Sequence, residues 1–98
     1  MADRHSAAYL VSLAARAIRE LAGLTERARR EDKRLATLAL DAEVRFAGAA
    51  DRAAFAEELT QAVAALAARY HTANAPDGRS FRVILGAYPA RPSKEVTS

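Results

Sequence analysis

The pattern of apolar and polar residues divides the chain into helical stretches and stretches with the period of a strand. Over residues 5–30, apolar residues recur every three or four positions, which is typical of an amphipathic helix. The members of this stripe are Leu10, Leu13, Ala17, Leu21, Leu24 and Ala28. Val11, Ala14 and Ile18 widen the stripe on one side, and Ser6 precedes it as a candidate N-cap.

Residues 35–46 alternate instead of recurring at a helical spacing. Every second residue from Leu38 to Phe46 is apolar, and most of the residues between them are polar or charged. This pattern predicts a strand with one face on a core and the other in water. Asp41 and Glu43 share the wet face, where paired carboxylates carry out acid-base chemistry only if a cleft perturbs them. We therefore interpret them as solvated side chains.

A second helix is predicted over residues 50–70. Its apolar stripe recurs at spacings of four, four, three and four, and consists of Phe55, Leu59, Val63, Leu66 and Tyr70. His71 follows directly, and a lone histidine at a helix end is more often an exposed cation or a cap than a metal ligand. The loop that comes next carries the turn residues Pro76, Asp77 and Gly78.

The last patterned stretch is residues 81–88, and both of its faces are mainly apolar. Phe81, Val83 and Leu85 lie on one face by the period of two, while Ile84 and Tyr88 lie on the other. Such a run predicts a strand that is covered on both sides.

Together these elements predict an α/β fold, in which a long N-terminal helix precedes a β-α-β unit. The helix between the two strands is long enough for a crossover, so the strands are expected to be parallel. Two parallel strands leave their outer edges unpaired, so we expect a homodimer that completes the sheet or a helix bundle. Burial of the first helix on its own sheet is an equally good alternative. Residues 1–92 would form one domain and residues 93–98 a disordered tail.

Composition narrows the classes of function. The net charge is +3 and the chain has no cysteine, which removes disulfides, thiolate metal sites and cysteine nucleophiles. No Ser/His/Asp, metal-ligand or glycine-rich phosphate pattern is present, so we predict neither an enzyme nor a cofactor. No apolar run reaches the length of a membrane span, and the N-terminus does not resemble a signal peptide, so a cytoplasmic protein without membrane contact is expected.

Cations gather at the end of the first helix. Five basic residues stand between positions 27 and 34: Arg27, Arg29, Arg30, Lys33 and Arg34. They would oppose the helix macrodipole while staying solvated. Contact with nucleic-acid phosphates is the alternative, although no aromatic or base-reading element accompanies the cluster.

Four runs of sequence together resemble a known family. These are residues 35–47, 50–60, 68–71 with its Arg69-Tyr70 pair, and 81–89 ending in Pro89. In order and spacing they are similar to the C-terminal segment of bacterial ArsR-like winged-helix transcriptional regulators, chiefly the actinobacterial type with an extended C-terminal domain. The resemblance covers residues 7–92. It implies a regulatory or dimerisation module in which any DNA contact would come from a winged helix-turn-helix that these residues do not contain.

Two sets of residues are candidates for binding. The predicted dimer interface consists of Leu10, Leu13, Ala17, Leu21, Leu24, Ile84 and Tyr88. A pocket for a small-molecule effector would use the aromatic residues Tyr9, Phe46, Tyr70 and Tyr88. The alternative for the aromatic set is plain core packing. A stand-alone sensing or protein-interaction domain is the alternative function.

Overall fold

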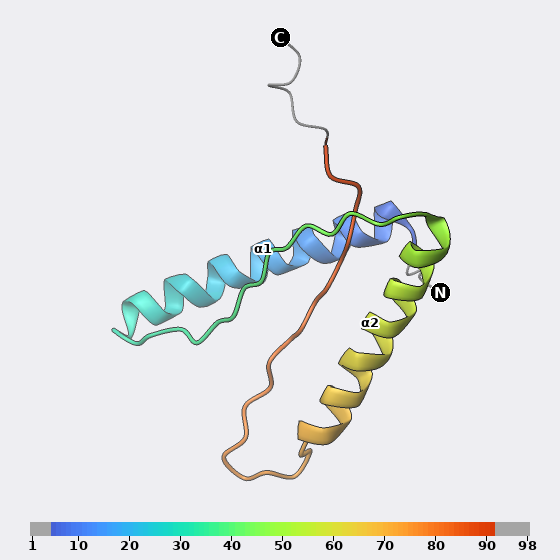
Figure 1. Ribbon diagram of the computed structural model, residues 1–98. Helices are drawn as coiled ribbons and strands as arrows, with labels where there is room; N and C mark the ends of the chain where they lie inside the picture. Colours follow the sequence, from blue (N-terminus) through green and yellow to red (C-terminus); the bar gives the residue numbers. More distant parts are fainter. Residues whose placement is uncertain (1–4, 92–98) are drawn as a thin grey trace. The chain divides into compact units, whose positions relative to one another are not determined.

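The computed structural model describes residues 5–91, which contain two helices and no strand (Figure 1). Helix α1 spans Ala7–Arg30 and helix α2 spans Ala49–Tyr70. The chain divides into two compact units, one containing residues 5–41 with 83–91 and the other Ala42–Arg82. Each unit therefore contains one helix. Both helices lie within one or two residues of their predicted bounds, so the helical part of the prediction is confirmed.

The N-terminal end of α1 is closed by a side chain. The Oγ of Ser6 accepts a hydrogen bond from the backbone N–H of Tyr9 at 3.3 Å, so the predicted N-cap is confirmed. This bond satisfies one of the donors that a helix leaves without an intrahelical partner at its start.

The C-terminal end of α1 is closed by the backbone. Asp32 has a φ of 54°, and its N–H donates to the Arg29 carbonyl at 3.2 Å. The N–H of Lys33 donates to the Ala28 carbonyl at 2.8 Å. These two bonds form a Schellman motif, which satisfies the last carbonyls and ends the helix.

Helix α2 has weaker closure. Gly48 at its N-cap makes no side-chain hydrogen bond, and at the other end the N–H of His71 donates to the Ala67 carbonyl at 2.9 Å. Asp51 in the first turn and Arg69 in the last carry the charges that the macrodipole favours. Phe46, just before the helix, packs on Phe55 with ring centroids 5.2 Å apart.

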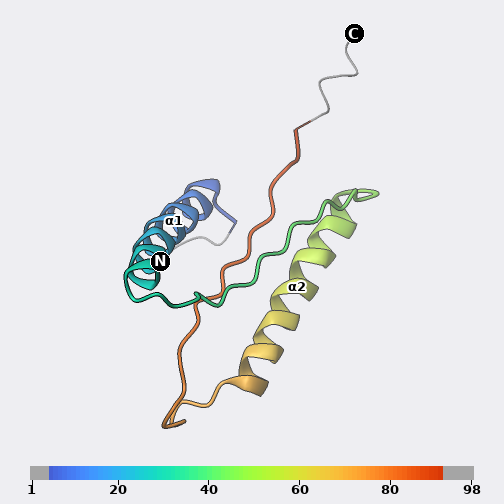
Figure 2. The ribbon, with the colours of Figure 1, turned by 90° about the vertical axis from the view of Figure 1, so that its left-hand side faces the viewer.

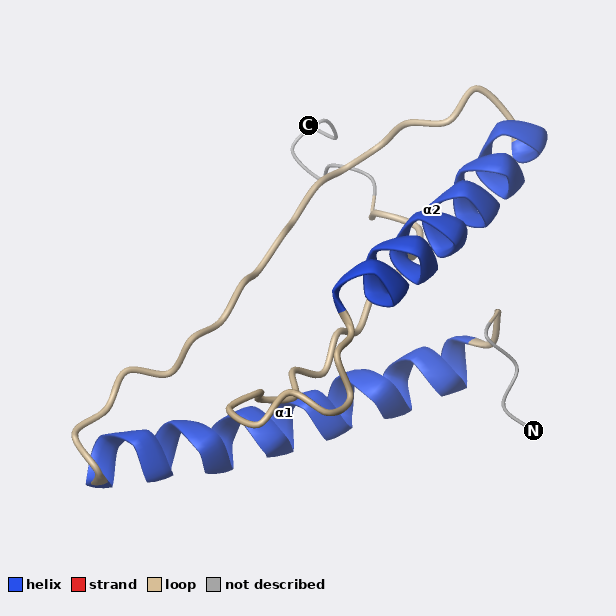
Figure 3. Cartoon of the chain, turned by 90° about the horizontal axis from the view of Figure 1, so that it is seen from below, coloured by secondary structure: helices blue, strands red, loops and turns tan. Residues whose placement is uncertain are grey.

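The predicted α/β fold is wrong for the described residues. Residues 35–46 and 81–88 form no strand, and the connections after both helices are irregular (Figures 2 and 3). There is accordingly no parallel β-α-β unit. The physical reason is that alternation specifies which face of a strand is apolar, whereas a strand also requires a neighbour for its N–H and C=O groups. Most side chains assigned to a core face are exposed, with Leu38 at 85% and Leu40 at 83%, while Phe46 and Ile84 are half-buried.

No side chain between residues 5 and 91 is fully buried. The best covered are half-buried, and in α1 they include Leu10, Leu13, Ala17 and Ala28. Neither helix in this range carries the long apolar run that crossing a bilayer requires. The expected tail, residues 93–98, lies outside the described residues.

Candidate functional site

Helix α1 carries two distinct faces, because 3.6 residues per turn bring residues three and four apart onto one side. The apolar stripe predicted from the sequence lies along one side of it. Leu21 and Leu24 in the second half of this stripe are each 45% exposed, and Ile18 beside it is 68% exposed. The second half of the stripe is therefore open to solvent, while Leu10, Leu13 and Ala17 are half-buried.

The first turns of α1 form one wall of an apolar hollow with the C-terminal segment of the same unit. The hollow has a volume of about 370 Å³ and is lined by Ala7, Leu10, Val11, Ala14 and Tyr88. Gly86 lies so close to Leu10 that a Cβ on the glycine would collide with the leucine methyl group Cδ1 and lie 3.3 Å from Cγ. The absence of a side chain at Gly86 therefore lets this segment approach the helix.

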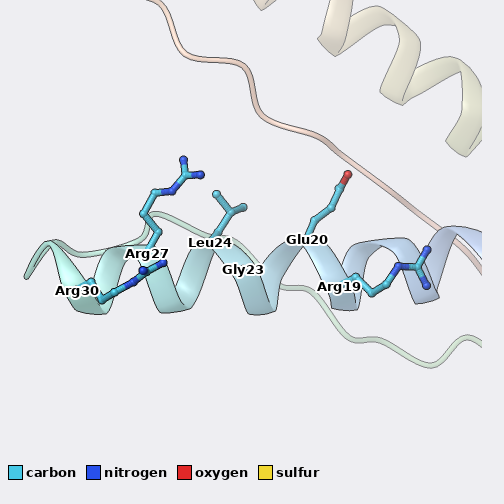
Figure 4. Close-up of a pocket in the computed structure, with 6 residues that line it drawn as sticks. All are labelled: Arg19, Glu20, Gly23, Leu24, Arg27 and Arg30. Atoms are coloured by element: carbon cyan, nitrogen blue, oxygen red, sulfur yellow. The ribbon is translucent and has the colours of Figure 1, made fainter.

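A second hollow, which we call the basic hollow, lies on the polar side of α1 (Figure 4). Its volume is about 560 Å³, and its lining is Arg19, Glu20, Gly23, Leu24, Arg27 and Arg30. Figure 4 shows Glu20, Leu24 and Arg27 projecting from one edge, while Arg19 and Arg30 run along the helix. Nothing lies within 4 Å of the position that a Cβ on Gly23 would take, so the floor of the basic hollow is open backbone.

Ion pairs along α1 neutralise part of its positive charge. Arg16 Nε lies 3.1 Å from Glu20 Oε2, and Glu26 pairs with Arg29 and, at 3.7 Å, with Arg30. The hydrogen bonds from Arg29 to Glu26 raise the pKa of the guanidinium above its ordinary value, and slight desolvation opposes them. All of these side chains are exposed, so each pair contributes little to stability.

Two arginines of the basic hollow make no ion pair with any described residue. Arg19 and Arg27 stand two turns apart on either side of Gly23, and the nearby carboxylates are engaged elsewhere on the helix. The arrangement can attract an anion, but it is open and solvated, and no buried polar group converges on it. We interpret the basic hollow as a solvated helix face.

No three His, Asp or Glu side chains between residues 5 and 91 lie close enough to hold a metal ion. Asp41 and Glu43 are exposed, and His71 serves as the C-cap of α2.

The four aromatic residues predicted to line a pocket belong to different units. Tyr9 and Tyr88 are in the unit of α1, while Phe46 and Tyr70 are in the unit of α2. Phe46 packs on Phe55, which precedes Tyr70 by about 22 Å of helical rise, so Phe46 and Tyr70 do not share a cavity. Arg69 lies over the ring of Tyr70, 5.7 Å from its centroid. Of the set, Tyr88 lines the apolar hollow and Tyr9 does not.

The residues predicted for the dimer interface lie in one unit. Five of them form the apolar stripe of α1, and Ile84 and Tyr88 belong to the segment that approaches that helix. Ile84 is half-buried and Tyr88 is exposed. Interpretation of the sequence missed the contact between Gly86 and Leu10. The available signal was a glycine inside an apolar run, which often marks close approach of the backbone to a neighbour.

Comparison with protein-family models, with curated proteins and with solved structures finds no match for this chain. The resemblance to ArsR-like regulators is therefore not tested by relatives, and any function rests on the chemistry of the surfaces described above.

Proposed function

We propose that this chain is a dimerisation and regulatory module of an ArsR-like bacterial transcriptional regulator, acting in the cytoplasm. The winged helix-turn-helix that would contact DNA is not among the described residues, since α1 and α2 are joined by a long irregular connection rather than a tight turn. The module would hold two subunits together, and an effector that binds to it would change how tightly they associate.

The observation that carries this proposal is the absence of any buried side chain in residues 5–91, although 51% of the chain is hydrophobic. Large apolar side chains remain open to solvent, among them Ile18 at 68% exposed and Val83 at 71%. Apolar surface left in water forgoes about 25 cal/mol per Å², which is a strong drive toward association.

A second copy is the partner that best fits the stripe of α1. The stripe is apolar along the whole helix and nearly charge-free, which favours a self-complementary contact between identical faces. Most soluble oligomers are built from identical subunits with two-fold symmetry.

The test is the solution mass, measured by light scattering across a dilution series. We expect twice the mass of one chain at high concentration, with dissociation only on strong dilution. A single-chain mass at every concentration would overturn the proposal, because the apolar surface would then have to be covered from within.

An effector site is a second candidate function, and the apolar hollow beside Tyr88 favours it. Its volume of about 370 Å³ falls within the range of small-molecule pockets, and its lining is apolar as such pockets mostly are. Screening apolar compounds for a shift in melting temperature tests this function. A Tyr88→Ala variant, which removes one wall, should lose the shift.

A further inference from the structure

The order of large and small residues along α1 specifies a direction for its pairing. Six residues recur at alternating spacings of four and three, which is the seam of a coiled coil. In chain order they are Leu10, Ala14, Ala17, Leu21, Leu24 and Ala28. We infer that α1 packs antiparallel against α1 of a second copy, with the apolar hollow receiving the partner's Leu24. This inference rests on the proposed function, because it requires a homodimer.

Reversing the order of the seam exchanges every leucine for an alanine. In an antiparallel pair centred near Arg19, each large side chain therefore faces a small one across the interface. The facing pairs are Leu10 with Ala28, Ala14 with Leu24, and Ala17 with Leu21. Alternation of large and small residues lets two surfaces interdigitate at the density of a protein interior.

A parallel pair would stack like residues instead. Leucine would meet leucine in three layers and alanine would meet alanine in the other three. The leucine layers would hold the two helices apart, and the alanine layers would then leave voids. Each void forfeits packing contacts, so the parallel arrangement is the weaker one.

The apolar hollow lies where the antiparallel pairing needs room. Ala14 is part of its wall, and the residue that faces Ala14 in this pairing is the partner's Leu24. The hollow is open, and Leu10, Val11 and Tyr88 supply the apolar atoms that a leucine side chain would contact. Leu24 in turn is 45% exposed.

The distribution of charge along α1 also favours antiparallel pairing. The last turn of α1 carries Arg27, Arg29 and Arg30, while the first turn carries no acidic residue. A parallel pair would place the two arginine-rich ends side by side. In the antiparallel pair the two Arg30 positions stand about 33 Å apart along the axis. That distance is several Debye lengths at physiological salt.

A size-swap tests the pairing. Ala14→Leu should raise the dimer dissociation constant roughly 10- to 100-fold, because two large side chains would then meet. Leu24→Ala alone should also raise it. The double variant Ala14→Leu with Leu24→Ala restores one large and one small residue, and should return to within about tenfold of the original value. Tighter dimerisation by Ala14→Leu alone would overturn the inference in favour of parallel pairing.

Spin-label distances give an independent measurement. The chain has no cysteine, so Arg19→Cys and Arg30→Cys each place one label per subunit. In the antiparallel pair the two labels at position 19 have no offset along the helix axis, whereas those at position 30 are offset by about 33 Å, so the distance at position 30 should be clearly the longer. Equal distances at the two positions would refute the pairing while leaving the dimer intact. A single-chain mass with no dipolar coupling would refute the proposed function itself.

Discussion

Helices α1 and α2 are nearly equal in length, with 24 and 22 residues, yet they are built differently. Helix α1 has a side-chain N-cap, a Schellman motif and ion pairs along a polar face of arginines. Helix α2 begins at an uncapped glycine and relies on alanine for much of its surface. Its apolar contacts are local, as between Phe46 and Phe55. The comparison shows that both ends of α1 are closed by hydrogen bonds, while the second half of its apolar stripe is exposed to solvent.

The difference between the two helices is tested most directly by placing a charge on the apolar stripe of each. Leu21→Asp on α1 should raise the dimer dissociation constant more than about 100-fold, because it buries a carboxylate without a partner. Leu66→Asp on α2 is the matched control, since Leu66 is 50% exposed and Leu21 45%. The control should leave association unchanged by light scattering. Equal loss from both substitutions would show that α1 has no special part in the dimer.

The close approach of Gly86 to Leu10 can be tested by adding a side chain at position 86. Gly86→Val should destabilise the protein by about 1–3 kcal/mol, because the new side chain meets Leu10. Urea unfolding gives the free energy. Gly23→Ala is the matched control: nothing lies near its Cβ position, so it should stabilise α1 by up to about 1 kcal/mol. A neutral Gly86→Val would mean that the C-terminal segment does not pack on α1.

The local packing of α2 is open to a double-mutant cycle. Phe46→Ala and Phe55→Ala should couple by about 0.5–1.5 kcal/mol, the range for an aromatic pair. Urea unfolding of both single variants and the double variant gives the coupling. Strictly additive losses would show that the two rings do not interact in solution.

Substitutions at the two N-caps should give the smallest difference in stability between the helices. Ser6→Ala removes the bond to the Tyr9 N–H and should cost about 1 kcal/mol of helix stability. Gly48→Ala removes no side-chain bond, but alanine is a poorer N-cap than glycine, so it should cost α2 roughly 0.5 kcal/mol, less than the Ser6 substitution costs α1. Amide hydrogen exchange in the first turn of each helix measures both. Comparable fraying from the two substitutions would mean that the Ser6 bond contributes nothing.

The sequence predicted the helices well because their signals are local. The spacing of apolar residues, the cap at Ser6 and the cations of the last turn all act within one helix. The strands were predicted wrongly because alternation over residues 35–46 and 81–88 says nothing about a hydrogen-bonding neighbour. The candidate site was predicted only in part. The stripe of α1 could be predicted from spacing, whereas the contact of Gly86 with Leu10 joins residues far apart in the chain.

The open stripe of α1 has a consequence for how the protein folds. Nearly all the hydrogen bonds described above close within a single helix, and such helices form in about a microsecond or less. In the proposed dimer, the apolar surface is covered only when two chains meet. Refolding from urea should therefore show a fast phase of helix formation that is independent of concentration. A slower second-order phase should follow, with a half-time that halves when the protein concentration doubles.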